Sequence, residues 1–154
     1  MQMFKPWSPV EVHQSIDAPR DEVFNTLSDP RTYPDWLVGA QRIRDVDSDF
    51  PAPGSKFDHS VGPTPELTAD DDTKAVEVQG HRRLVLEVHV GPVQGEVEFT
   101  LKKRGDDRTE VRMRERPIGP AVALTPVLRP VLAARNHTSL RNLAKLIEQN
   151  TNAA

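Results

Sequence analysis

The 154-residue sequence contains no cysteine, and this absence excludes several kinds of site at once. Without thiols there is no disulfide, no cysteine-ligated zinc or iron–sulfur centre and no thiol nucleophile. No apolar run is longer than four residues, so the sequence contains neither a membrane-spanning helix nor the core of a secretory signal. We therefore expect no integral membrane association and a cytoplasmic location.

A basic excess is also missing, as are the short motifs of several enzyme classes. The chain has 20 Lys and Arg against 23 Asp and Glu, whereas a protein that coats nucleic acid needs surplus cations, so we expect no nucleic-acid partner. There is no glycine-rich phosphate loop, no serine nucleophile elbow and no HExxH motif. The acidic run Asp70–Asp72 lacks the spacing and the glycine of a calcium loop, and we interpret it as a solvated turn. We expect no metal and no cofactor.

The sequence does contain enough apolar residues for one core. Thirty-eight residues are Val, Leu, Ile or Phe, which is more than a disordered chain carries. The length predicts a single domain over residues 1–150 and a short C-terminal tail over 151–154. The oligomeric state is left open.

Apolar alternation, helical spacing and the positions of Pro and Gly predict the order of the elements. A strand at Val10–Ile16 is followed by two short helices, which begin at Pro19 and at Asp29. Residues 64–72 are interpreted as a loop or an irregular strand start. Further strands are expected at 41–46, 56–61, 74–79, 82–90, 93–104 and 108–117, and a long helix at 120–150.

The last hairpin can be assigned a register if Gly105–Asp107 forms its loop. One face then carries three pairs of opposite charge: Lys102 with Glu110, Glu98 with Arg114, and Glu96 with Arg116. The other face carries mainly apolar pairs: Leu101 with Val111, Phe99 with Met113, and Val97 with Glu115. This is the pattern of a half-buried sheet, whose apolar face needs a cover that only the final helix is long enough to supply.

Four segments resemble the START/Bet v 1-like helix-grip (SRPBCC) superfamily, often labelled polyketide cyclase/dehydrase, over roughly residues 8–149. They are Ser15–Phe24, Asp29–Trp36, Pro53–Phe57, and Arg135–Asn136 with Ser139–Leu143. The resemblance implies an α+β helix-grip fold, in which a curved antiparallel sheet of six to seven strands wraps round the C-terminal helix. It also implies a hollow between sheet and helix that holds an apolar small molecule.

Three polar residues lie on otherwise apolar faces and are candidates for ligand binding. His59 could donate to a ligand oxygen or act as a base. Alternatively, it could donate to a backbone carbonyl or be exposed to solvent at a strand edge. Glu115 is an acid on the same strand face as Val111 and Met113. There it could bond a ligand, reach solvent beside the strand end or pair with an arginine. Asn136 interrupts a line of leucines and needs a partner, which could be a ligand, water or a neighbouring loop.

Trp36 resembles the tryptophan at the mouth of the family's hollow, although core packing would look the same in the sequence. Arg135 and His137 are expected at the rim or exposed. We expect a pocket of about 300–1,000 Å³, the usual size of ligand sites. The apolar residues expected to line it are Phe57, Val97, Phe99, Met113 and Leu132.

The leading hypothesis is a small-molecule binding protein for an apolar or aromatic ligand. The first alternative is a polyketide aromatase/cyclase or dehydratase, for which His59 and Glu115 are the only evident acid–base pair. We assign no catalytic residue, and whether the protein is an enzyme stays open. The second alternative is a protein- or membrane-partner module, like the quinone-binding or ribosome-associated relatives, which would need an exposed apolar patch or a basic face.

Overall fold

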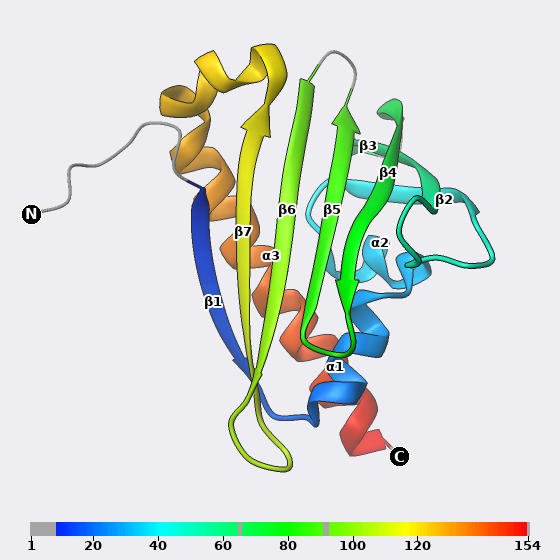
Figure 1. Ribbon diagram of the computed structural model, residues 1–154, viewed down its shortest axis with the longest axis vertical. Coiled ribbons are helices and arrows are strands. Elements are labelled where there is room, and N and C mark those ends of the chain that lie inside the picture. Colours follow the sequence, from blue (N-terminus) through cyan, green and yellow to red (C-terminus); the bar gives the residue numbers. More distant parts are fainter. Residues whose placement is uncertain (1–8, 65, 91–92, 154) are drawn as a thin grey trace, which may run out of the picture.

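A computed structural model describes residues 9–64, 66–90 and 93–153, and its elements follow the expected order (Figure 1). The strands are β1 (Val10–Ile16), β2 (Ala40–Val46), β3 (Lys56–Thr64), β4 (Leu67–Gln79), β5 (Arg83–Val90), β6 (Val93–Lys103) and β7 (Thr109–Ile118). The helices are α1 (Arg20–Leu27), η1 (Pro30–Thr32), α2 (Tyr33–Trp36), η2 (Gly119–Leu124) and α3 (Thr125–Ala153).

The seven strands form one antiparallel sheet in the order β1-β7-β6-β5-β4-β3-β2. Helix α3 runs along one face of this curved sheet, and α1 and α2 lie beside the C-terminal half of α3 (Figure 1). The helix-grip architecture expected from the sequence is therefore confirmed. In the part of the chain that the structure describes, no helix is both long and apolar enough to cross a membrane.

The register proposed for the last hairpin is confirmed at every pair. On the inner face Phe99 lies opposite Met113, and both are buried. On the outer face Arg114 Nη1 lies 3.5 Å from Glu98 Oε1, and Arg116 Nη2 donates to Glu96 Oε1 at 3.2 Å. One face is thus apolar and the other carries ion pairs. This fixes the register, because a shift by one residue would turn the apolar side chains toward solvent and the charged side chains toward the core.

The core forms where α3 meets the sheet and α1. Leu140, Leu143, Ala144 and Ile147 follow the spacing of one helical face, and all are buried. They belong to the same apolar cluster as Val23 and Phe24 of α1 and the inner residues of β6 and β7. Burying each large side chain contributes about 1.5–3 kcal/mol, so the C-terminal half of α3 holds the helix on the sheet.

Two sequence expectations are corrected. Asp70–Asp72 lie inside β4, which pairs with β3 on one side and β5 on the other, and not in a turn. Neighbouring side chains contact two of these carboxylates: His89 Nδ1 lies 2.6 Å from Asp72 Oδ1, and Arg44 Nε lies 3.8 Å from Asp70 Oδ1. At the other end of the chain, residues 119–124 form the 3₁₀ helix η2, and α3 continues past residue 150 to Ala153.

Candidate functional site

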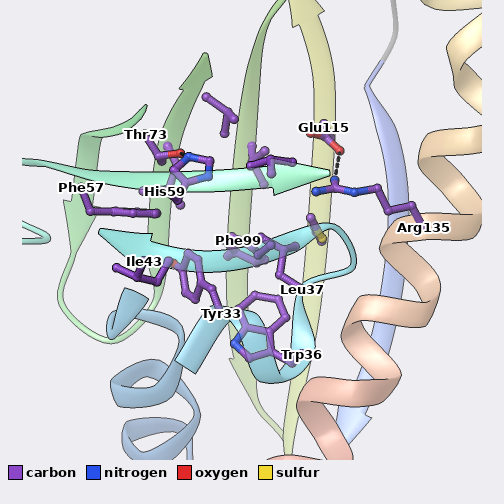
Figure 2. Close-up of a pocket in the computed structure, with 16 residues that line it drawn as sticks. Tyr33, Trp36, Leu37, Ile43, Phe57, His59, Thr73, Phe99, Glu115 and Arg135 are labelled. Atoms are coloured by element: carbon purple, nitrogen blue, oxygen red, sulfur yellow. Dashed lines mark hydrogen bonds and ion pairs between the residues drawn. The ribbon is translucent and has the colours of Figure 1, made fainter. Parts of the chain in front are cut away.

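A small pocket lies between the concave face of the sheet and the segment that leads from α2 into β2 (Figure 2). Its volume is about 60 Å³, well below the expected size. Seven of the residues named from the sequence line it: Trp36, Phe57, His59, Val97, Phe99, Met113 and Glu115. It is also lined by Tyr33, Leu37, Ala40, Ile43, Val61, Thr73, Leu86, Val88 and Arg135. The pocket is therefore apolar and aromatic with few polar groups.

One end of the pocket is formed by His59 of β3 and Thr73 of β4. His59 Nε2 lies 2.9 Å from Thr73 Oγ1, and both side chains are buried. Burial lowers the pKa of His59, while the Asp71 carboxylate and a hydrogen bond to the Asp72 backbone act in the opposite direction. The imidazole is therefore neutral at pH 7 and lies beside the Phe57 ring, with centroids 5.2 Å apart.

The other end is formed by Glu115 of β7 and two neighbouring residues of α3. Asn136 Nδ2 donates to Glu115 Oε1 at 2.8 Å, and Arg135 Nη1 lies 3.6 Å from the same oxygen. Asn136 is fully buried and does not line the pocket, so its amide serves Glu115. Figure 2 shows Glu115 and Arg135 at the opposite end of the lining residues from His59 and Thr73.

Helix α3 also holds the chain between α2 and β2 through polar side chains. Arg135 Nε donates to the carbonyl of Val38 at 3.0 Å, and the Val38 amide donates to Ser139 Oγ at 3.0 Å. Asn142 Nδ2 reaches the carbonyl of Trp36 at 3.3 Å. Gly39 follows with φ +94°, a backbone conformation that favours glycine, and turns the chain into β2. This segment, with Leu37 against the pocket, is thus attached to α3 at three points.

The aromatic side chains present rings and not polar atoms to the pocket. Trp36 Nε1 donates to Thr32 Oγ1 at 3.1 Å, and the Tyr33 hydroxyl donates to the Leu27 carbonyl at 2.6 Å. Burial raises the pKa of Tyr33, which keeps its hydroxyl protonated. Neither group is free to exchange a proton with a ligand, so the polar chemistry is confined to the two ends.

A second hollow, which we call the outer groove, lies beside the N-terminal half of α3. It is open, has a volume of about 290 Å³, and is lined by Leu128 and Leu132 of α3 and by residues of β5–β7. Leu132, expected in the pocket, lines this groove instead. Val61, Val88, Glu115 and Arg135 line both hollows.

Sequence reasoning missed Thr73 and placed Arg135 at the rim. A signal for Arg135 exists in the spacing Leu128, Leu132, Arg135, Ser139, Asn142, which alternates steps of four and three and marks one face of a helix. Thr73 directly follows the acidic run, which the sequence pattern assigns to a turn. That assignment gives no indication that the Thr73 side chain points into the pocket. Among the described residues, no group of three or more His, Asp and Glu side chains could hold a metal ion.

The comparisons with solved structures show the same fold in proteins of low sequence identity. The Zhui aromatase/cyclase from Streptomyces sp. R1128 has 16% identity and a TM-score of 0.73, with 93% of this chain and 94% of that chain covered. A norcoclaurine synthase point mutant from Thalictrum flavum, in complex with a transition state analogue, has 17% identity and a TM-score of 0.63, with 93% and 95% covered. A protein of Chromobacterium violaceum has 15% identity and a TM-score of 0.75, with 92% and 98% covered.

No curated protein matches the sequence. A family model described as polyketide cyclase/dehydrase and lipid transport matches residues 9–148. Because this match spans most of the chain and agrees with the fold, the chain belongs to the polyketide cyclase/dehydrase and lipid transport family within the Bet v 1-like superfamily.

Proposed function

We propose that the protein binds a neutral aromatic small molecule, with one ligand oxygen bonded at the His59–Thr73 end of the pocket. The observation that carries this proposal is a buried, neutral imidazole–hydroxyl pair at the end of an otherwise apolar, aromatic pocket. The neutral imidazole has a single N–H, which bonds the Asp72 backbone, so the Thr73 hydroxyl donates to His59 Nε2 and its remaining lone pair can accept from a ligand hydroxyl.

The charges at the other end favour a neutral ligand. Glu115 and Arg135 form an ion pair within the wall, so the described pocket lining carries no net charge from these two groups. An anion would have to compete with Glu115 for the guanidinium, and a cation would have to compete with Arg135. A neutral phenol meets neither obstacle.

The family name and the aromatase/cyclase neighbour also support a cyclase-type reaction in this pocket. Such a reaction needs an acid and a base that reach one region of the substrate. His59 and Glu115 stand at opposite ends, and Glu115 already bonds Asn136 and Arg135 (Figure 2). The separation of these groups favours binding over proton transfer between them, and binding is the function we propose.

Calorimetric titration with 2-naphthol tests this proposal, with naphthalene as the probe that lacks the hydroxyl. We expect Thr73→Val to weaken binding of 2-naphthol by about two- to tenfold, the worth of one hydrogen bond, and to leave naphthalene unaffected. Thr100→Val is the matched control, because Thr100 lies on the same sheet opposite Arg112 and does not line the pocket. Equal 2-naphthol affinity in wild type and Thr73→Val, or no binding of either probe, would contradict the proposal.

A further inference from the structure

We infer that Arg135 and Glu115 form a movable partition, and that a bound ligand displaces Arg135 and occupies the pocket and the outer groove as one site. This inference rests on the proposed function and extends it to the length of the ligand and to the residue that controls its access. The occupant of the groove is the distal part of the same molecule.

The two hollows are neighbours and share part of their lining. The shared residues are Val61, Val88 and Glu115 on the sheet and Arg135 on α3. Figure 2 shows the Arg135 side chain reaching from α3 to Glu115 at the end of the pocket. The charged pair therefore stands in the wall between the hollows.

The volumes show why both hollows are needed. A cavity must offer about 10–15 Å³ to hold one water molecule, so the closed pocket of about 60 Å³ has room for a few waters and not for an aromatic ring system. The outer groove is about 290 Å³. Only the joined space enters the range of about 300–1,000 Å³ in which small-molecule sites fall.

Arg135 is the member of the pair that can move. Glu115 keeps its 2.8 Å hydrogen bond from Asn136 when the arginine leaves, so the carboxylate retains a partner. The Arg135 side chain is 29% exposed and can carry its charge into water on a long flexible stem. The contacts that hold it are the Val38 carbonyl at 3.0 Å, Asn136 Oδ1 at 3.3 Å and Glu115 at 3.6 Å.

The groove side of the partition suits an aromatic ring with a polar substituent. Leu128 and Leu132 supply apolar walls, and Gly95 presents bare backbone at the floor. A Cβ built on Gly95 would lie 4.0 Å from Glu115 Oε2, so the second carboxylate oxygen borders the groove next to this glycine. A ligand hydroxyl in the middle of the joined site could donate to that oxygen. The joined site therefore suits an elongated aromatic ligand that carries a hydroxyl donor.

Nuclear magnetic resonance of the ¹⁵N-labelled wild-type protein tests the inference without any substitution. The probes are 2-naphthol and the longer, three-ring 2-anthrol. We expect 2-anthrol to shift the amide signals of Val97 and Phe99 in the pocket, that of Gly95 in the groove, and the Arg135 Nε–H signal. Shifts confined to Val97 and Phe99, with Gly95 and Arg135 Nε–H unmoved, would leave the proposed function standing and overturn the partition. No shift with either probe would overturn both.

Two variants and a control test the inference further through the affinity and the association rate of the probes. Gly95→Val fills the groove floor, and we expect it to weaken 2-anthrol binding by about tenfold and 2-naphthol binding by less. Arg135→Met removes the hydrogen bonds that hold the partition closed, and we expect association of 2-anthrol to accelerate by about tenfold. Val131→Thr is the control, because Val131 is exposed on the same helix and lines neither hollow. Equal association rates in Arg135→Met and wild type would contradict the gating role.

Discussion

The hydrogen bond between Asn136 and Glu115 joins the final helix to the last strand, and its removal has a calculable cost. Asn136→Leu keeps the number and branching of the side-chain heavy atoms, so the loss is chiefly the 2.8 Å bond from Nδ2 to a buried carboxylate. Hydrogen bonds to charged groups contribute about 1.5–3 kcal/mol. The 3.3 Å contact from Arg135 Nη1 to Asn136 Oδ1 is long and adds little. We expect a loss of about 2–3 kcal/mol in the free energy of unfolding.

The assay is urea denaturation followed by the fluorescence of Trp36, which is 1% exposed in the folded protein. Glu115→Met, which leaves the Asn136 amide without its acceptor, should cost about 1–3 kcal/mol. The double variant removes both polar partners, so it should be less destabilised than the sum of the two single variants by about 1–2 kcal/mol. Thr138→Ala, at an exposed position of α3, should stay within about 0.5 kcal/mol of wild type. Additive single variants, with a coupling below about 0.5 kcal/mol, would refute the interaction.

Further predictions concern pH and one glycine. The pKa of His59 is lowered from 6.5 in the folded protein, so its contribution to stability is complete above pH 6.5 and declines as pH falls below that value. In a plot of the urea midpoint against pH, His59→Gln should therefore make the decline on the acid side less steep. The pKa of His89 is raised, chiefly by its hydrogen bond to Asp72, so its contribution to stability is complete below pH 6.5 and is lost as pH rises. His89→Gln should therefore make the decline on the alkaline side of the same plot less steep. A change of the same limb by both variants would contradict this assignment. Gly62→Ala should lower the thermal midpoint sharply because its Cβ would overlap the Leu67 carbonyl oxygen, whereas Gly54→Ala, where nothing lies within 4 Å, should cost less despite its positive φ. Similar losses in the two glycine variants would show that strand β3 relaxes at Gly62 and would contradict this prediction.

The register of the β6–β7 hairpin could be predicted because its determinants are local and redundant. A one-residue slip would separate Glu98 from Arg114 and turn Phe99 outward, so charge and burial both select one pairing. The same two-residue period placed His59 and Glu115 on the inner face, and the structure agrees.

Other features depend on neighbours that are distant in the sequence. The acidic run Asp70–Asp72 has poor strand propensity, yet pairing on both edges and contacts with the side chains of Arg44 and His89 allow it to remain extended. On α3, Arg135 and Asn136 are adjacent in the sequence, and which of them faces the pocket depends on where β7 crosses the helix. The small pocket volume results from the packing of side chains from six strands and two helices, which no periodicity encodes.

The pairing of β1 with β7 has a consequence for how the chain acquires its structure during synthesis. Val10 lies opposite Glu115, so the first strand stays without its partner until more than a hundred residues have been made. Sheets closed by such distant contacts fold slowly, since the entropy of loop closure is lost before the contacts form. Helix α3, which supplies both the cover of the apolar face and Arg135, is made after all seven strands. A nascent chain that ends before Thr125 therefore exposes the inner surface of the sheet. Synthesis of α3 covers that surface, protects it from aggregation and adds Arg135 to the pocket.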